Sequence, residues 1–457
     1  MRETATLIAK YNTPGPRYTS YPTVPHWNLL DFSADRWKTS IAVKENSWIA
    51  ADGVSVYIHL PYCESLCTFC ACHKRITKNH LVEESYIDAL ILEWDMYVSL
   101  LGFLPRLKEI HLGGGTPSFF SAKNLGRLIE HIQKNAIVDA EPAFSFEGHP
   151  NNTSEEHLQT LYDLGFRRVS FGVQDYDPVV QKAIHRIQPF ENVAYVTEAA
   201  RKIGYTSLSH DLVFGLPFQT INSIENTIQK TLELKPERIA FYSYAHVPWI
   251  KGTGQRGFDE NDLPSGNEKR ALYERGLELF QLGGYEEVGM DHFALPNDEL
   301  FEAKQNKTLH RNFMGYTTQS TKAMIGLGAS SISDVWGAFG QNIKDVEAYK
   351  NAIFSGELPI EKGHILSEKD LFIRKQILNI MCNMETTWSL KEILNVDQEK
   401  LFSKLQDFQD DGLLTFDVNG LQVLETGRPF LRNICMAFDQ YLLEEGASKG
   451  RLFSQTI

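Results

Sequence analysis

The sequence predicts an α/β protein built around a barrel of parallel strands. From residue 54 to residue 248, short runs of apolar and β-branched residues alternate with longer amphipathic stretches. This alternation is typical of β–α units with a parallel sheet, and right-handed crossovers would curl the sheet into a barrel. Because only six units precede the change of pattern near Pro248, we expect an open, partial barrel rather than a closed barrel of eight strands.

The elements of this region follow one another regularly. The expected strands are 55–60, 109–115, 143–148, 168–173, 208–215 and 238–244. The expected helices between them are 83–101, 122–133, 154–164, 191–203 and 221–234. In such barrels the loops after the strands build the active site, so we expect the functional side chains there.

Length and composition exclude several classes of protein. At 457 residues the chain exceeds what one hydrophobic core usually supports, so appendages are expected. No run approaches the roughly 18 apolar residues of a membrane span, and a net charge of −13 disfavours nucleic-acid binding. The N-terminal residues lack a secretory signal pattern, and the six cysteines do not resemble a disulfide framework. We therefore expect a cytoplasmic protein.

The chain is expected to have four parts. Residues 1–50 form an arm without regular structure, packed on the main domain rather than disordered because it is rich in aromatic residues. Residues 51–295 form the barrel, with a further helix at 267–282 and a strand at 285–294. Residues 296–364 form a connector that closes the barrel and contains the glycine-punctuated run 325–333. Residues 365–457 form a mainly helical C-terminal domain.

The C-terminal domain is expected to be winged-helix-like. Its helices precede two alternating runs joined by Asn419 and Gly420, which is a strong hairpin signal. Many such domains bind DNA, but residues 365–442 contain twelve Asp and Glu against eight Lys and Arg, so this one would repel phosphate. A lid or docking domain over the barrel mouth is therefore favoured.

Four of the six cysteines lie within ten residues after the first expected strand: Cys63, Cys67, Cys70 and Cys72. The first three have the spacing C-x3-C-x2-C, by which one loop can hold three corners of an iron–sulfur cubane. The fourth iron could then chelate S-adenosylmethionine (SAM), and one electron could cleave SAM to a 5′-deoxyadenosyl radical. Zinc sites usually use two separated ligand pairs, and disulfides suit small secreted domains, so both alternatives are less favoured.

The cysteine loop resembles the radical SAM superfamily, and Cys72, one residue beyond the third ligand position, resembles its oxygen-independent coproporphyrinogen III oxidase branch. The resemblance runs from about Tyr11 to residues 432–436. It implies a TIM-like partial (β/α)6 barrel and one 4Fe-4S cluster held by Cys63, Cys67 and Cys70. It also implies that Cys72 is required for activity without binding the cluster, the alternative being a bystander thiol.

A glycine-rich segment, GGGTP at 113–117, follows the second strand. Three residues without Cβ let the backbone approach a ligand closely, although the motif alone predicts only a tight turn. The resemblance implies that Gly114, Gly115 and Thr116 contact the methionyl amino group of SAM.

Further SAM contacts are implied by the resemblance at or near the strand ends. Tyr57 and Glu147 would contact the SAM molecule on the cluster. A second SAM molecule would contact Phe69, Gln174, Arg186, Asp211, Ala245 and Ile332. Packing and helix capping are the ordinary roles of such side chains.

The segment HRNFMGYTT at 310–318 most resembles the coproporphyrinogen branch. It adds Arg311 and Phe313 to Tyr57 and Cys72 as residues of the catalytic group, with Phe313 as a packing wall. Met314 departs from the glutamine common at its position, and a methionine cannot supply the hydrogen bonds of an amide.

Two other features concern the neighbourhood of the substrate. His149 stands where an acidic residue often follows the glutamate motif. A tetrapyrrole with four carboxylates needs cationic partners, and Arg17, Arg186 and Arg311 lie in matching motifs, although surface ion pairing is an ordinary alternative.

The resemblance implies anaerobic oxidative decarboxylation of two propionates of coproporphyrinogen III to vinyl groups, giving protoporphyrinogen IX in haem biosynthesis. An electron donor such as flavodoxin or ferredoxin would supply electrons, and a monomer is expected. A haem-binding chaperone of the same family, without decarboxylase activity, is the main alternative. A radical methyltransferase that opens haem is another.

Overall fold

The centre of the molecule is a twelve-stranded mixed sheet with the strand order β16-β15-β14-β13-β1-β4-β5-β6-β7-β8-β10-β9. A computed structural model describes residues 4–27, 31–42, 47–249, 254–445 and 453–456. Six neighbouring strands are parallel and follow the chain order. They are β1 (Val54–Leu60), β4 (Arg106–Gly114), β5 (Ile137–Gly148), β6 (Phe166–Gln174), β7 (Ser207–Phe214) and β8 (Arg238–Ser243). The predicted partial (β/α)6 barrel is therefore confirmed.

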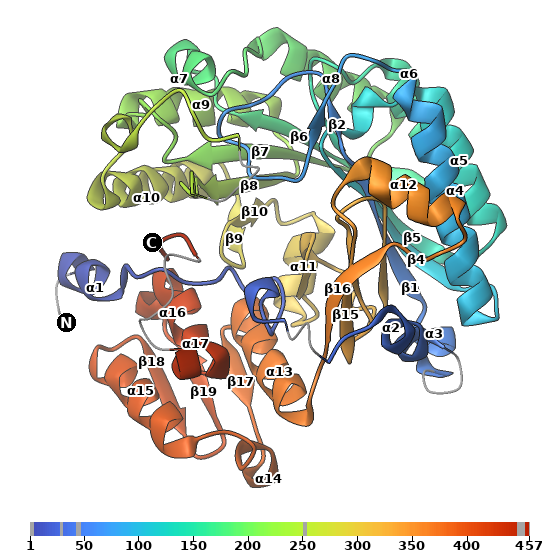
Figure 1. The fold of residues 1–457 in the computed structure, drawn as a ribbon. Coiled ribbons are helices and arrows are strands. Elements are labelled where there is room, and N and C mark those ends of the chain that lie inside the picture. The colour runs from blue at the N-terminus through green and yellow to red at the C-terminus, as the bar shows by residue number, and fades with distance from the viewer. Residues whose placement is uncertain (1–3, 28–30, 43–46, 250–253, 446–452, 457) are drawn as a thin grey trace.

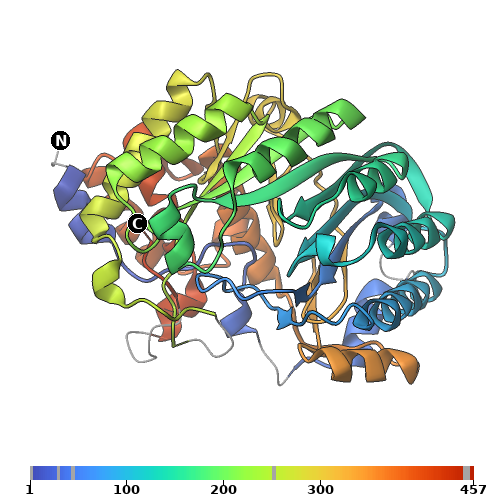
Figure 2. The ribbon, with the colours of Figure 1, turned by 90° about the horizontal axis from the view of Figure 1, so that it is seen from above.

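Helices cover the outer face of the curved sheet (Figures 1 and 2). They are α4 (Val82–Leu101), α5 (Ala122–Lys134), α6 (Glu155–Asp163), α7 (Pro178–Ala183), α8 (Phe190–Ile203), α9 (Ile221–Leu234) and α10 (Gly266–Leu282). In α5 the apolar residues Leu125, Leu128, Ile129 and Ile132 recur at helical spacing and are all buried, which fixes the face that packs on the strands. All the helices expected in this region are present, and α7 is an additional short one.

Both edges of the parallel sheet are extended by strands from the later part of the chain. β13 (Met324–Leu327) pairs parallel with β1, and three antiparallel strands follow: β14 (Ile332–Asp334), β15 (Ala338–Asn342) and β16 (Ile360–Ile365). At the other edge β10 (His292–Ala294) pairs with β8, and β9 (Glu286–Val288) pairs with β10. Residues 285–294 therefore form a hairpin instead of the single expected strand.

Glu93 of α4 holds the β13 edge in place. Its side chain is buried and accepts hydrogen bonds from the amide of Gly328 (2.8 Å), the hydroxyl of Tyr349 (2.6 Å) and the amide group of Asn342 (2.6 Å). These partners lie after β13, in α12 (Val346–Phe354) and in β15. Burial raises the pKa of Glu93 to about 7, although the three bonds oppose that shift.

The N-terminal arm is not irregular, contrary to expectation. It contains α1 (Thr4–Tyr11), α2 (Ala34–Ile41) and α3 (Ser47–Asp52), and most of its described aromatic residues are buried. Tyr11, Tyr18 and Tyr21 pack in a cluster with the C-terminal helices. Trp27 stacks on Phe339 at 5.4 Å, and Trp37 lies in the core of the barrel. Figure 1 shows that the arm runs between the barrel and the C-terminal region.

The C-terminal region contains helices and a small sheet, as expected. The helices are α13 (Glu368–Asn383), α14 (Leu390–Ile393), α15 (Gln398–Asp410), α16 (Leu431–Met436) and α17 (Gln440–Glu445). The sheet has the order β17-β19-β18, with β17 (Glu385–Thr387), β18 (Leu414–Asp417) and β19 (Gly420–Val423). Asp417 accepts from the amides of Asn419 and Gly420 (2.7 and 3.1 Å), which fixes the predicted hairpin turn.

Two smaller elements complete the region between the barrel and the C-terminal helices. They are α11 (Glu299–Gln305) and a hairpin of β11 (His310–Asn312) with β12 (Gly315–Thr317). None of the helices in the described ranges has the length and apolar character needed to cross a membrane.

Replacing Glu93 by alanine is expected to lower the free energy of unfolding by about 3–5 kcal/mol, because three buried donors lose their acceptor. Chemical denaturation of the cluster-free protein measures this loss. Glu84→Ala removes an exposed carboxylate from the same helix and should change the free energy by no more than about 0.5 kcal/mol. Equal effects of the two substitutions would contradict the role of Glu93.

The raised pKa of Glu93 predicts a pH dependence of stability. The folded pKa of about 7 lies above the value of 4.5 for a free glutamate. The folded chain therefore binds the proton more tightly, and this contribution is present below pH 4.5 and lost as the pH rises through 7. Wild-type protein should lose stability between pH 5 and pH 8 relative to Glu93→Gln. A difference between the two proteins that does not vary with pH would exclude Glu93 as the titrating group.

Candidate active site

A cavity of about 750 Å³ lies at the carboxyl ends of the parallel strands. The cysteine loop, the glycine-rich loop and the ends of β5 to β8 line it. Thirteen of the residues predicted from the sequence line this one space: Cys63, Cys67, Phe69, Cys70, Cys72, Gly114, Gly115, Thr116, Glu147, Gln174, Arg186, Asp211 and Ala245. The structure therefore brings most of the predicted site together.

The cysteine loop is held by backbone hydrogen bonds on both sides. β2 (Tyr62–Cys63) pairs with β3 (Arg75–Ile76), which closes the base of the loop. The amide of Gly254 donates to the carbonyl of Cys70 (3.0 Å), and the side chain of Gln255 donates to the carbonyls of Phe69 and Ala245 (3.2 and 2.7 Å). These hydrogen bonds fasten both sides of the loop over the strand ends.

Hydrogen-bond donors surround the thiols. The hydroxyl of Thr116 donates to Sγ of Cys63 (3.2 Å), and Nη1 of Arg186 lies 3.7 Å from Sγ of Cys67. Burial raises the pKa of Cys63 to about 11, and the bond from Thr116 opposes this rise. The pKa of Cys70 is lowered to about 6, mainly because Cys70 accepts a hydrogen bond from Cys72.

The donor set suits a cluster better than a single metal ion. No group of three or more His, Cys, Asp or Glu side chains within the described ranges is close enough to hold one ion. In a cubane each thiolate binds a different iron, and three thiols spread along one wall of a cavity meet that need. Cys63, Cys67 and Cys70 are therefore the residues that could hold a 4Fe-4S cluster.

The glycine-rich loop presses against the end of β1, and side chains would not fit there. A Cβ on Gly115 would lie 2.6 Å from the carbonyl oxygen of Pro61, and a Cβ on Gly114, whose φ is +114°, would lie 2.8 Å from the ring of His59. A Cβ on Gly113 would likewise lie 3.0 Å from the carboxylate of Glu147 and 3.2 Å from the ring of Tyr57. The glycine therefore leaves room for both side chains.

Tyr57 lies next to the cavity in a chain of polar contacts. Its hydroxyl lies 3.0 Å from Nδ1 of His59, whose Nε2 donates to the carbonyl of His73 (3.0 Å). Burial lowers the pKa of His59 to about 4, so this imidazole is neutral at pH 7. The sequence interpretation did not single out His59, although its place two residues after Tyr57 on the same strand face could have indicated it.

A second histidine that the sequence interpretation missed is His111, on β4. Its ring stacks with that of Tyr57 at 6.1 Å, and its nitrogens lie 2.8 Å from the hydroxyl of Ser145 and 3.4 Å from Glu147. The repeated pattern Ile-His-Leu in β1 and β4 is the signal that could have revealed both histidines.

Five of the six residues assigned to the second SAM molecule line the same cavity, all except Ile332. Nη2 of Arg186 donates to the carbonyl of Gly172 (2.5 Å), and a Cβ on Gly172 would lie 2.7 Å from Nε2 of Gln174. Asp211 accepts from the hydroxyl of Ser170 (2.6 Å), and burial raises the pKa of Asp211 to about 6. These residues therefore offer several polar atoms to a ligand.

Arg311, Phe313 and Ile332 do not line the 750 Å³ cavity. The guanidinium of Arg311 lies 4.5 Å from the ring centroid of Tyr316, and its Nη2 donates to the carbonyl of Arg17 (3.4 Å). Phe313 and Ile332 pack together in the hydrophobic cluster around Phe339. Of the three, Arg311 is connected to the cavity, through Arg17, which does line it.

The two residues that depart from the family pattern occupy different places. His149 lines the 750 Å³ cavity, and burial, together with the charge of Arg186, lowers its pKa to about 3. Met314 lines a smaller cavity of about 120 Å³ inside the barrel. Met314 therefore lies among polar residues inside the barrel, and the cysteines of the loop do not line this smaller cavity.

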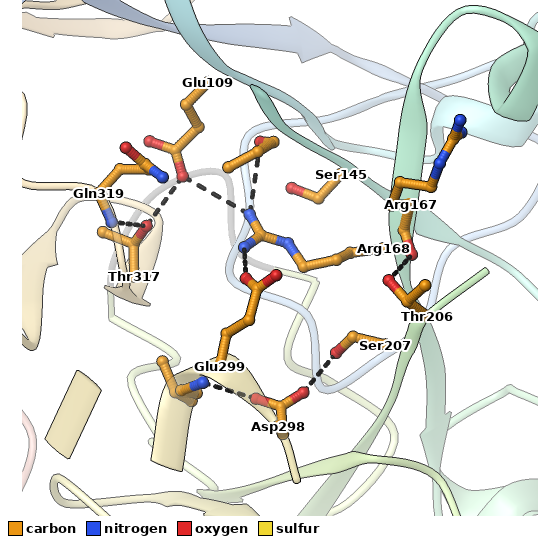
Figure 3. A network of polar contacts seen from close by, with 12 residues as sticks. Glu109, Ser145, Arg167, Arg168, Thr206, Ser207, Asp298, Glu299, Thr317 and Gln319 are labelled. Carbon is orange, nitrogen blue, oxygen red and sulfur yellow. Dashed lines mark hydrogen bonds and ion pairs between the residues drawn. The ribbon is translucent and has the colours of Figure 1, made fainter. Parts of the chain in front are cut away.

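Beneath the active site, the barrel interior is filled by a polar network. Figure 3 shows Arg168 between Glu109 and Glu299, at 3.8 and 3.7 Å. Glu109 also accepts from Thr317 (2.9 Å) and Ser55 (2.8 Å). Glu109 and Arg168 are buried and lie beside each other, whereas Glu299 is largely exposed. The network is a structural floor that joins β1, β4, β6 and the hairpin of β11 and β12.

Comparison with known proteins adds independent information. The model of the Radical SAM superfamily matches residues 57–231. A Helicobacter pylori (strain ATCC 700392 / 26695) protein, oxygen-independent coproporphyrinogen III oxidase, is 39% identical over 98% of each chain, and the Escherichia coli (strain K12) protein of the same name is 36% identical over 99% of this chain and 98% of its own. The solved structure of coproporphyrinogen III oxidase from Escherichia coli, described as a radical SAM enzyme, has a TM-score of 0.87 at 33% identity, covering 96% of this chain and 99% of the other.

Single substitutions by serine should distinguish the three cysteines that bind the cluster from Cys72. Cys63→Ser, Cys67→Ser and Cys70→Ser are each expected to lose most of the iron and labile sulfide after anaerobic reconstitution, because each removes one corner of the site. Cys72→Ser is the matched control from the same loop and should keep the wild-type iron content. Retention of a full cluster in any of the first three variants would remove that cysteine from the ligand set.

Proposed function

This chain belongs to the family of oxygen-independent coproporphyrinogen III oxidases within the radical SAM superfamily, and we propose that it converts coproporphyrinogen III to protoporphyrinogen IX. The reaction is the anaerobic oxidative decarboxylation of two propionates to vinyl groups, in haem biosynthesis. The single observation that carries the proposal is the cavity in which three cysteine thiols face a glycine-rich loop and a ring of strand-end polar groups. A haem-binding chaperone is not favoured, because the relatives reported above are named oxidases.

The proposed ligands fit the residues around the cavity. Cys63, Cys67 and Cys70 hold the cluster, and Gly114 with Gly115 leaves room for the SAM molecule beside it. When bound, the reduced cluster and SAM would supply a 5′-deoxyadenosyl radical for abstraction of a hydrogen atom from the β-carbon of a substrate propionate; loss of carbon dioxide, with one electron passed to a separate electron acceptor, would then give the vinyl group.

Side chains around the loop offset the negative charge of the three cysteine thiolates. Three thiolates bring negative charge into a half-buried loop, and an ionised group needs hydrogen bonds or opposite charge when it is buried. Thr116 and Arg186 direct an O–H and an N–H at Cys63 and Cys67. The ammonium of Lys74 donates to the carbonyls of Cys70 and Cys72 (3.2 Å each), which adds positive charge beside the third ligand.

Four residues remain in the proposed catalytic group: Cys72, Tyr57, Arg311 and Phe313. The sulfur of Cys72 borders the cavity one residue beyond the ligand loop, where it can meet the substrate. Tyr57 and Glu147 both lie over Gly113, each within 3.2 Å of the position that a Cβ would take there. Arg311 supports the backbone of Arg17, and Phe313 closes the hydrophobic side of the arm.

We also propose that the arm and the C-terminal domain, residues 1–50 and 365–457, cover the barrel mouth and exclude water from the radical. Arg432 of α16 donates to the carbonyls of Gly15 and Pro16 in the arm, the latter at 2.9 Å, and to those of Gln455 and Thr456 (3.1 and 3.2 Å). One buried guanidinium thus ties the arm to the end of the described chain.

Several finer features belong to the same proposal. Two SAM molecules bind at once, a flavodoxin or ferredoxin donates electrons, and the protein works as a cytoplasmic monomer. Gln174, Arg186 and Asp211 support the second SAM site, because all three line the cavity and offer polar side chains to a ligand.

The stoichiometry of SAM tests the second site. Equilibrium dialysis of the reconstituted protein is expected to give two SAM molecules per chain, and Asp211→Asn is expected to reduce this to one. Added SAM should still alter the spin-resonance spectrum of the reduced cluster in Asp211→Asn, because the first molecule remains. A wild-type stoichiometry of one would exclude the second site.

The activity itself is tested by anaerobic incubation of the reconstituted protein with SAM, a reductant and coproporphyrinogen III. The expected products are a tetrapyrrole that has lost two carboxyl groups and 5′-deoxyadenosine, measured together by mass spectrometry. Cys72→Ser should keep its cluster and make no vinyl product. Tight binding in a haem titration without any decarboxylation would instead support the chaperone, and a methylated product would support a methyltransferase.

A further inference from the structure

A second cavity, of about 250 Å³, adjoins the one that contains the cysteine loop. It lies between the ends of β7 and β8, helix α10, the hairpin of β9 and β10, the arm and the C-terminal region. Arg17 and Ser243 line both cavities, and Nη2 of Arg17 donates to the carbonyl of Ser243 (2.6 Å). The two cavities are therefore neighbours that share Arg17 and Ser243 in their walls.

Five cationic side chains line this second cavity, and two of them have carboxylate partners. Arg428 lies 3.5 Å from Glu287 and 3.2 Å from Glu425, both of which also line the cavity. Arg270 pairs with Glu274 (2.8 Å). The charges of Arg270 and Arg428 are therefore compensated.

The other three cations are Arg17, Lys269 and Arg432. Among the described residues no ion pair joins any of them to a carboxylate, and they donate instead to backbone carbonyls, with bonds that include ones of 2.6, 2.9 and 2.9 Å. Burial lowers the pKa of Lys269 to about 7 and that of Arg432 to about 9, and the charge of Arg17 contributes to both shifts. An anion would relieve this excess of buried positive charge.

The acidic group nearest to these cations compensates only part of their charge. Asp291 lines the cavity and attracts Arg17 and Arg311, but it already accepts a hydrogen bond from Nδ1 of His292 (2.7 Å). Glu287 and Glu425 face Arg428, and the lining as a whole has five cations against three carboxylates. The cavity is therefore electropositive.

The position of Lys269 is built into the fold. Its methylene stem crosses Gly215, whose φ is +82° and whose missing Cβ would lie 2.9 Å from Cε. The ammonium donates to the carbonyl of Tyr244 (2.9 Å), and two of its three N–H groups remain for a ligand. A solvated surface lysine would have neither constraint.

We propose that this second cavity binds a propionate of the tetrapyrrole that the reaction leaves intact. The inference rests on the proposed function, in which two of four carboxylates are removed and two persist in the product. The cavity has one third of the volume of the larger one, 250 against 750 Å³, which suits a side chain rather than the macrocycle. Arg17 and Lys269 are the direct donors, and Arg432 supplies charge and holds the arm.

The assignment explains how two reacting propionates could be presented to one radical source. A carboxylate held by charge-assisted hydrogen bonds is fixed in position, so the opposite side of the macrocycle is directed toward the cysteine loop. Exchange of one retained propionate for the other in this cavity would turn the macrocycle and bring the second reacting chain into place.

Porphyrin binding to Lys269→Met tests the proposal without turnover. Reconstituted holoprotein, without reductant, is titrated by fluorescence with coproporphyrin III, with protoporphyrin IX, which keeps only the two retained propionates, and with protoporphyrin IX dimethyl ester. We expect Lys269→Met to weaken binding of the first two by a similar factor, roughly tenfold or more. The dimethyl ester should bind equally to both proteins, which also shows that the variant is folded.

Arg275→Gln is the matched control. Arg275 lies on the same helix, pairs with Glu225 and Glu278 (2.5 and 2.6 Å) and does not line the cavity. Its loss should leave all three affinities unchanged, so a similar weakening in this variant would attribute the effect to overall charge and overturn the proposal.

Two other outcomes would also overturn the assignment. Weakened binding of coproporphyrin III alone would show that Lys269 holds a reacting propionate. Unchanged porphyrin affinities, with inorganic phosphate protecting wild-type protein but not Lys269→Met from thermal unfolding, would assign the cavity to a free anion. A protein that shows the expected pattern but does not decarboxylate would support the cavity assignment and refute the proposed activity.

Discussion

The active site depends on one constraint: three thiols must stand on a single short loop at the open end of a parallel barrel, and the loop must not move. The pairing of β2 with β3 closes its base, and the amide of Gly254 with the side chain of Gln255 holds its far side. Thr116 and Arg186 then direct donors at two of the sulfurs. The glycine-rich loop and the strand-end polar groups are useful only because this loop has a fixed position.

The arm, the C-terminal region and the strands added beside β1 are joined to the barrel by specific contacts. The arm runs between the barrel and the C-terminal region and is fixed by Arg432, while its tyrosines pack among the C-terminal helices. Glu93 joins the strands added beside β1 to the first barrel helix. These contacts connect segments more than two hundred residues apart in sequence, so the cover and the site are assembled together. The two cavities on either side of Arg17 result from this assembly.

Much of the barrel could be predicted from the sequence, because its information is local. Six strands and five helices follow from the periodicity of apolar residues. The cysteine and glycine motifs can be recognised from the spacing of their residues. The rest depends on distant pairing. Nothing in the short run around Met324 indicates that β13 pairs with β1, and the helices of the arm are too short for a clear period. Lys269 gains its role from neighbours that the fold alone supplies.

The central claim is that three thiolates leave one iron of the cluster open and that SAM fills this place. Pulsed spin-resonance spectroscopy of the reduced, reconstituted protein with SAM labelled with nitrogen-15 in the amino group and oxygen-17 in the carboxylate tests it most directly. The account predicts hyperfine coupling of both labels to the cluster. A reduced cluster that shows no coupling to either label, while SAM is bound, would contradict it.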